Sequence, residues 1–337
     1  MSGGARADEA ELRRRLAEAG IAAPHNEAVV IDLAGDPPLG RSAGAIAVEE
    51  ADRVVDGLGA AMVAARAKQG AIAVRDVAAQ QAIARALEAR EARSATVARV
   101  PDAWPSVGVD RDVGLEGAWV LDGERLLDLE AAALGRTRAP RRVTIAGAVA
   151  RPGVQRLEAP LAVGELVARA GGPAADVGPA WVALDGGAWG GRAIDREEPP
   201  RSSLVLVLPA EHALVARART PVVDHLRRVA SACEGCRLCT DACPVALDGT
   251  PLAPHEIVAA VAQGLDAGTR PAAAIACAGC GLCDAACPSG LSPHAMVGAV
   301  RARLPDGIAA PPRGEPHPDR AARRMSIELL LLRAGLG

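Results

Sequence analysis

The sequence predicts a mixed α/β fold in three parts: an N-terminal α/β layer, a small β-grasp module and an α-helical C-terminal region. Three observations predict it. Strand-like and helical segments alternate over residues 8–100, a strand–turn–strand–helix pattern occupies 141–172, and all eight cysteines fall in two short runs after residue 232. The length of 337 residues agrees, because domains commonly span roughly 100–200 residues.

The N-terminal part alternates between apolar runs of strand length and stretches with helical periodicity. The expected elements are a helix at 8–19 ended by Gly20, a strand at 27–33, a helix at 47–69 ended by Gly70, a strand at 71–74, a helix at 76–92 and a strand at 95–100. Strands that alternate with helices favour parallel pairing. Pro101 and Pro105 then interrupt the pattern, and a glycine-rich loop follows. We therefore predict an α/β domain over residues 1–135.

The middle part has the pattern of a β-grasp module. RRVTIAGAV (141–149) alternates as a half-buried strand does, ARPG supplies a turn, and VQRLE is the return strand. A short helix within 159–172 ends at a glycine pair, and the apolar run LVLVLP (204–209) completes the unit. Compact units of this kind are recurring supersecondary motifs. We assign residues 140–215 to this module.

The C-terminal part contains both cysteine runs. A helical segment at 220–231 leads into them, and we predict a domain over 220–304. The stretch 305–320 is rich in Pro, Arg and Gly, as linkers often are. The last segment, 321–337, has one strongly apolar helical face but is too short to span a bilayer. We expect it to be a docking helix.

Composition argues against some classes of function. The chain has no Phe or Tyr and only four Trp, so few side chains can stack on single-stranded nucleic acid. Its net charge of −3 creates no field that attracts polyanions, and we expect no nucleic-acid partner. Residues 1–20 lack the apolar core of a signal peptide, and no run of about 18 apolar residues occurs. The sequence thus predicts a cytoplasmic protein without a transmembrane segment.

The two cysteine runs share one spacing. The first is CEGCRLCTDACP (233–244) and the second is CAGCGLCDAACP (277–288), and both follow the pattern C-x2-C-x2-C-x3-C-P. Each cysteine of the first run recurs 44 residues later, as 277 follows 233, which indicates an internal duplication. In a chain without an export signal, clustered cysteines favour metal ligation over disulfides. The spacing is that of bacterial ferredoxins with two 4Fe–4S clusters.

This spacing has a physical reason. Three thiolates separated by two residues each let a tight loop wrap one face of a cubane cluster, and Gly235, Gly279 and Gly281 allow close approach of the backbone. In two-cluster ferredoxins the fourth cysteine of a run ligates the other cluster. We therefore assign cluster 1 to Cys233, Cys236, Cys239 and Cys287, and cluster 2 to Cys277, Cys280, Cys283 and Cys243. The sequence names no catalytic residue.

Some alternatives stay open at this point. Structural zinc usually takes four ligands from paired C-x-x-C knuckles, whereas both runs here are complete and carry Pro after the fourth cysteine. His255 and His294 each follow a Pro, so they either tune the clusters by hydrogen bonding or begin helices. Arg237, inside the first run, either stabilises a reduced cluster or is a solvated surface residue.

The order of the segments resembles a known family. ATVARVPDAWP (95–105), then VTIAGAVARPGVQRLEAPLAVGELVARAGG (143–172), then the two cysteine runs, is similar to the C subunit of Rnf-type electron-transport complexes and to the cobalamin reductase of propanediol-utilisation microcompartments. The tail RRMSIELLLLRAGLG (323–337) is more similar to the cobalamin reductase branch. The resemblance implies a domain like the flavin subunit of respiratory complex I, a soluble-ligand-binding β-grasp (SLBB) domain and a dicluster ferredoxin-type domain.

The N-terminal part departs from that family. The resemblance implies a glycine-rich loop that cradles the FMN phosphate, followed by an acidic segment. Here EAGIAAPH (18–25) stands in place of the loop, and AGDPPL (34–39) has lost both glutamates of the acidic segment. Because the phosphate nest and the polar anchors are missing, we expect a degenerate domain that has lost FMN binding. Asp32 and Asp36 are either remnants of a flavin site or ordinary loop acids.

The motifs and the resemblance lead to three hypotheses of function. The first is an electron-transfer protein that relays single electrons through two 4Fe–4S clusters, from a flavoprotein donor to a corrinoid-processing or membrane electron-transport acceptor. The second is an oxidoreductase, namely an NADH- and FMN-dependent cob(III)alamin reductase. In the third, the SLBB domain binds a corrinoid or another soluble ligand and the clusters are structural. The resemblance also implies a place at the membrane periphery or inside a bacterial microcompartment.

Overall fold

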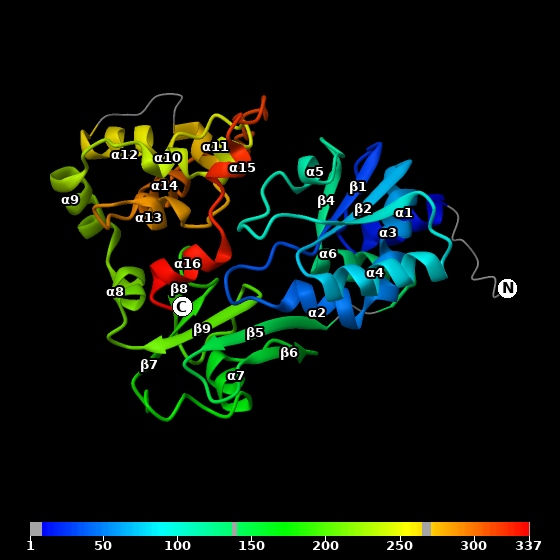
Figure 1. Ribbon diagram of the computed structural model, residues 1–337, viewed down its shortest axis with the longest axis horizontal. Coiled ribbons are helices and arrows are strands. Elements are labelled where there is room, and N and C mark those ends of the chain that lie inside the picture. Colours follow the sequence, from blue (N-terminus) through cyan, green and yellow to red (C-terminus); the bar gives the residue numbers. More distant parts are fainter. Residues whose placement is uncertain (1–8, 137–139, 265–270, 337) are drawn as a thin grey trace.

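The computed structural model describes residues 9–136, 140–264 and 271–336. They form three neighbouring bodies: a parallel α/β layer, a second sheet, and a helical region that carries the cysteines (Figure 1). The mixed α/β fold class predicted from the sequence is confirmed. The first eight residues of the predicted N-terminal domain and the last residue of the predicted docking helix lie outside the described residues.

The α/β layer has a four-stranded parallel sheet with the strand order β3-β2-β1-β4. Its elements are α1 (Glu9–Glu18), β1 (Ala28–Asp32), α2 (Ser42–Glu49), α3 (Ala51–Ala65), β2 (Gln69–Val74), α4 (Val77–Ala89), β3 (Ala95–Arg99), α5 (Val109–Asp112), β4 (Trp119–Asp122) and α6 (Gly123–Ala133). The strands are parallel because each crossover carries the chain back to the same end of the sheet.

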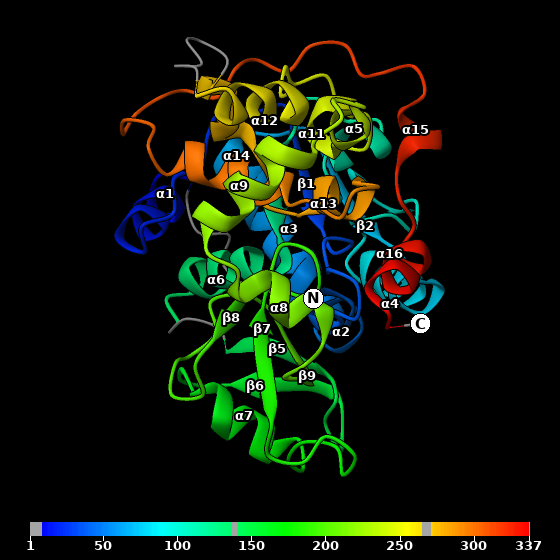
Figure 2. The ribbon, with the colours of Figure 1, turned by 90° about the vertical axis from the view of Figure 1, so that its left-hand side faces the viewer.

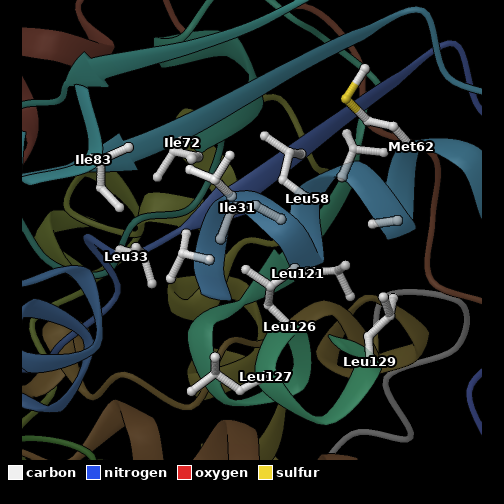
Figure 3. Packing of buried hydrophobic residues seen from close by; sticks show 14 of the residues in the cluster. Ile31, Leu33, Leu58, Met62, Ile72, Ile83, Leu121, Leu126, Leu127 and Leu129 are labelled. Atoms are coloured by element: carbon white, nitrogen blue, oxygen red, sulfur yellow. The ribbon is translucent and has the colours of Figure 1, made fainter. Parts of the chain in front are cut away.

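The core of this layer consists of aliphatic side chains (Figure 3). Ile31 and Ile72 project from the sheet toward Leu58 of α3 and Leu126 of α6, and all four are at most 1% exposed. Helices α3 and α6 come close because α3 carries Gly57, where a methyl group would lie 3.1 Å from Leu126 Cδ1. Small and branched residues thus fill a core that has no Phe or Tyr.

Two predictions for this layer were wrong in detail. The helix expected at 47–69 is two helices, and the second ends at Ala65, where Arg66 adopts a left-handed φ of 59°. Gly70 does not end a helix but lies in β2, where a methyl group would meet Met62 Sδ at 2.7 Å. The sequence pattern also gave no indication of β4 and α6, which follow the predicted loop.

The second sheet has five strands in the order β6-β5-β9-β7-β8. Its elements are β5 (Arg141–Gly147), β6 (Gly153–Leu157), α7 (Val163–Arg169), β7 (Trp181–Asp185), β8 (Arg192–Ile194) and β9 (Leu204–Pro209). Strands β5 and β9 pair in parallel, and the other pairs are antiparallel. The predicted hairpin, helix and closing strand are present, whereas β7 and β8 were not indicated by the sequence pattern.

The helical region repeats one arrangement. Its elements are α8 (Ala213–Arg219), α9 (Val222–Ala232), α10 (Leu238–Asp241), α11 (Pro244–Leu247), α12 (Pro254–Ala262), the 3-10 helix η1 (Pro271–Ala276), α13 (Leu282–Ala286) and α14 (Pro293–Arg301). Each cysteine run forms a loop and a short helix, α10 or α13, and a longer helix, α12 or α14, follows it. In Figure 2, α9, α12 and α14 lie together above the second sheet.

The segment predicted to be a linker, 305–320, is held by ion pairs. Arg313 donates to Asp110 Oδ1 at 2.9 Å and to Asp248 Oδ2 at 3.0 Å. Arg320 donates to Asp112 Oδ1 at 2.7 Å. Asp110 and Asp248 are buried, so these partners offset the cost of taking their charges out of water. The segment therefore ties the α/β layer to the helical region.

The apolar C-terminal segment forms two helices instead of the one expected. They are α15 (Arg320–Arg323) and α16 (Ile327–Ala334). Helix α16, red in Figure 1, lies between the helical region and the second sheet. Its Leu330 is fully buried and belongs to a core shared by those two bodies. Among the described residues, no helix is long and apolar enough to cross a membrane.

Candidate metal centres

Four cysteines from both runs meet at a first site. Cys233, Cys236 and Cys239 of the first run and Cys287 of the second line one small cavity, together with His255. Cys233 and Cys236 are exposed, and Cys239 is buried. The four cysteines are those assigned to cluster 1 from the sequence, and their ligation of one cluster stays a prediction.

The backbone of the first run turns tightly around this cavity. Helix α9 ends just before Cys233, and two residues of the loop have a left-handed backbone, Gly235 with φ of 66° and Arg237 with φ of 68°. Helix α10 then begins at Leu238. Left-handed residues reverse the chain within a few positions, and glycine adopts this conformation most easily. The three cysteines of the loop are thereby directed to one side.

The remaining cysteines form a second site deeper in the protein. The Cys283 thiol interacts electrostatically with Cys280, Cys243 and Cys277, so one cysteine of the first run again joins three of the second. Three of the four are buried, and Cys277 is half-buried. The Gly279 N–H points to Cys277 Sγ at 3.5 Å, as expected where backbone amides face cluster sulfurs. These four are the cysteines assigned to cluster 2.

The donor sets fit iron–sulfur clusters chemically. Burial, together with repulsion from neighbouring cysteine thiolates, raises the pKa of Cys239 and Cys280 to about 12. Cysteine binds metal as the thiolate, so these protons must leave when iron binds, and the positive charge of the iron offsets the buried negative charge. Among the described residues, no group of three or more His, Cys, Asp or Glu side chains is arranged to hold a single metal ion.

The second loop is covered by the turn between β7 and β8. A methyl group on Gly281 would lie 2.1 Å from the Trp189 carbonyl oxygen, and one on Gly190 would lie 2.1 Å from the Gly279 carbonyl oxygen. The two backbones therefore touch, and a side chain at either position would force them apart. This contact shields the second site from water.

Helix α16 completes the cover. The Trp189 Nε1–H donates to the Leu330 carbonyl at 3.1 Å, and Arg333 donates to the Ala285 carbonyl of the second cysteine loop at 2.6 Å. Leu282 of the same loop is 2% exposed and shares the core of Trp189 and Leu330. The second sheet, the second loop and α16 thus form one packed unit.

Comparisons with known proteins agree with this arrangement. Residues 232–292 match the 4Fe-4S dicluster domain family, and residues 142–188 match the SLBB domain family. The chain is 31% identical to cobalamin reductase PduS of Salmonella typhimurium over 234 residues. The aligned region covers 63% of this chain and 50% of that protein. The chain therefore resembles cobalamin reductase PduS over these residues. The resemblance to the cobalamin reductase branch is confirmed, and the ferredoxin-type domain gives the chain a role in electron transfer.

Further similarities cover fewer residues or have a lower sequence identity. Cobalamin reductase PduS of Citrobacter freundii is 39% identical over 124 residues, which are 36% of this chain and 27% of that protein. The chain thus spans half or less of the length of these PduS relatives. A chain of an NAD+-reducing [NiFe]-hydrogenase in the H2-reduced state is 16% identical with a TM-score of 0.48, covering 89% of this chain and 63% of that chain. The air-oxidised state gives the same identity and TM-score, with 94% and 65% covered.

The two histidines considered from the sequence lie at the starts of α12 and α14. The His255 N–H donates to Thr240 Oγ1 at 3.1 Å, and the His294 N–H donates to Asp284 Oδ1 at 2.7 Å. Thr240 and Asp284 hold the same position in the duplicated motif. The prediction that both histidines begin helices is confirmed. His255 also lines the first cavity and lies 2.7 Å from Thr240 Oγ1 through Nδ1.

Sequence reasoning missed Arg217, which lies beside the second site. This side chain of α8 donates to the Ala188 carbonyl at 2.7 Å, and its guanidinium lies 4.5 Å from the centre of the Trp189 ring. Arg217 Nε is 4.0 Å from Asp284 Oδ2. The sequence held no signal for this contact, because α8 is far from Asp284 along the chain and belongs to no motif.

The acids considered as flavin remnants bond within the α/β layer. Asp36 accepts from the Ala43 N–H at 2.8 Å and from the Gly44 N–H at 3.2 Å, at the start of α2. Asp32 accepts from the Ser106 hydroxyl. Burial raises the pKa of both carboxyl groups. Residues 18–25, which replace the glycine-rich loop, form the end of α1 and the connection to β1.

Proposed function

We propose that this chain relays single electrons through two 4Fe–4S clusters. Cys233, Cys236, Cys239 and Cys287 hold one cluster, and Cys277, Cys280, Cys283 and Cys243 hold the other. The observation that carries the proposal is the exchange of the fourth cysteine: Cys287 lines the cavity of the first run, and Cys243 interacts with the cysteines of the second. Two-cluster ferredoxins exchange this ligand in the same way.

We propose that electrons enter or leave the protein through the exposed first site. Cys233 and Cys236 reach the surface, so a redox partner can approach the first cluster, whereas the second lies under the β7–β8 turn and α16. We propose a flavoprotein or reductase as the donor and a corrinoid-processing or membrane electron-transport protein as the acceptor. The setting is the cytoplasm, at the membrane periphery or inside a microcompartment, and the SLBB domain is available to bind a corrinoid or another soluble ligand.

Metal analysis tests the proposal directly. Protein reconstituted without oxygen should contain about eight irons and about eight acid-labile sulfides per chain, because each cubane holds four of each. Reduction with dithionite should give EPR signals of two interacting clusters. A content of about four irons would contradict the two-cluster assignment, and clusters that dithionite does not reduce would favour a structural role.

A second candidate is the reduction of a corrinoid by this chain itself. The likeness to cobalamin reductase PduS over 63% of the chain favours it. The reduced, reconstituted protein would then convert cob(III)alamin in a stopped-flow absorbance assay, and a flavin assay would show whether FMN takes part. Electron transfer to a ferredoxin-like acceptor without any change in the cobalamin spectrum would support the relay alone.

A further inference from the structure

The second site has a partly buried cation that the sequence motifs do not contain. Arg217 Nε lies 4.0 Å from Asp284 Oδ2, and its charge also interacts with Cys283. Only 21% of the Arg217 side chain is exposed. Burial lowers the pKa of Arg217, while Asp284 and Cys283 oppose this effect. Arginine keeps its proton in proteins, so the guanidinium is a fixed positive charge beside this site.

The first site is arranged differently. The position of Asp284 is taken by Thr240, an uncharged side chain bonded to His255. The arginine of the first run, Arg237, is exposed, and water and salt screen an exposed charge. A charge of the same sign therefore acts much more weakly on the first site than Arg217 acts on the second.

We infer that Arg217 raises the reduction potential of the cluster held by Cys277, Cys280, Cys283 and Cys243, and so sets the order in which the two clusters take electrons. This inference rests on the proposed function. Each step is a one-electron reduction, in which the donor loses one electron, the cluster gains one, and no bond forms or breaks. The gained negative charge is stabilised by a nearby cation, and most strongly where little water reaches.

Asp284 must be controlled in the test. Its carboxylate opposes the effect of Arg217, and a buried carboxylate that loses its arginine can take up a proton and hide the change in charge. The variant Asp284→Asn removes this complication. Asparagine keeps the oxygen that accepts from the His294 N–H, so the link to α14 is retained.

The experiment is a redox titration followed by EPR on anaerobically reconstituted full-length protein. Asp284→Asn should raise the potential of one cluster, and adding Arg217→Gln should lower it again. We expect at least a tenfold change in the ratio of reduced to oxidised cluster at fixed potential, or 59 mV for one electron. Asp284→Asn/Arg217→Lys should stay close to Asp284→Asn. Arg217→Met, whose apolar stem can cover Trp189, replaces Arg217→Gln if that variant does not retain its clusters.

Two controls make the result specific. Arg333→Gln removes an exposed arginine that donates to the same loop, at Ala285, and should leave both potentials unchanged. A water-soluble paramagnetic chelate should broaden the EPR signal of the exposed cluster, and the cluster that shifts must be the other one. Equal shifts in the Gln and Lys variants, or a shift of the exposed cluster, would overturn the inference. If both clusters are present and the variants leave their potentials unchanged, the inference about Arg217 is wrong but the proposed function stands. If the unaltered protein lacks the clusters, the proposed function is wrong as well.

Discussion

The two cysteine runs are copies of one motif in opposite environments. Leu238 of the first run is 44% exposed, whereas Leu282, at the same position of the second, is 2% exposed. The copies differ at four positions, where the first has Glu234, Arg237, Thr240 and Asp241 and the second has Ala278, Gly281, Asp284 and Ala285. Three of the four residues of the exposed copy are thus charged, and three of the four in the covered copy are small.

The cysteine motif therefore specifies the backbone of the loop, whereas the segments packed against the loop determine which side chains fit between the cysteines. Arg237 and Gly281 have nearly the same left-handed backbone, with φ of 68° and 70°. The first points into water and tolerates a long side chain, whereas the second touches the Trp189 carbonyl and leaves room for none. Charges collect in the exposed copy because an unpaired charge is costly to bury.

The largest expected effect comes from replacing the fourth cysteine of either run by alanine. Cys287→Ala should remove the exposed cluster, although Cys287 belongs to the covered run, because its side chain lines the first cavity. Cys243→Ala should remove the covered cluster instead. EPR with a water-soluble paramagnetic chelate distinguishes the two signals. Loss of the covered cluster in Cys287→Ala would show that each run holds its own cluster.

Replacing the equivalent leucines, Leu238 and Leu282, by alanine should lower the free energy of unfolding by different amounts in the two copies. Leu282→Ala should lower the free energy of unfolding by about 2–5 kcal/mol, because it leaves a cavity in the core shared with Trp189 and Leu330. Leu238→Ala should change it by less than about 1 kcal/mol, because that side chain is nearly half exposed. Anaerobic denaturant titrations of the cluster-loaded protein measure both values. Similar losses in the two variants would contradict the packing difference.

Alanine substitutions at two glycines of the second loop measure what the backbone contact between Gly281 and Trp189 contributes to stability. Gly279 and Gly281 both have φ of 70°, so alanine at either costs about 1–2 kcal/mol in backbone strain. Gly281→Ala should cost about 1–3 kcal/mol more, since its methyl group meets the Trp189 carbonyl while that of Gly279→Ala meets nothing within 4 Å. The same denaturant titrations apply, and equal costs at the two glycines would mean that the turn does not press on this loop.

The smallest effect concerns the order in which the clusters are lost. A chelator should remove iron from the exposed site before the covered one, because Cys233 and Cys236 are exposed whereas Cys280 and Cys283 are buried. The bleaching of the cluster absorbance should then have two phases, and EPR samples taken between them should retain the covered cluster. If the covered cluster disappears first, the β7–β8 turn does not protect it.

Much of the fold was predictable because its signals are local. The alternation of strand and helix up to residue 100 and the hairpin RRVTIAGAV–VQRLE depend on the period of neighbouring residues, and both are present. The wrong end of the predicted helix at 47–69 shows the limit of such signals. Glycine is a usual helix terminator, but here Gly70 lies in β2, where its missing side chain makes room for Met62 of α3.

The sequence by itself determined the spacing of the cysteines, the duplication and the expected exchange of the fourth ligand, since all three follow from one short spacing pattern that occurs twice in the chain. The tertiary structure alone decided which copy faces water, that 305–320 is tied down by ion pairs, and that Arg217 lies beside Asp284. Burial and electrostatic neighbours arise from contacts between segments far apart in the chain, such as Gly281 with Trp189. One motif can therefore specify two similar loops, while only their packing makes the two sites different.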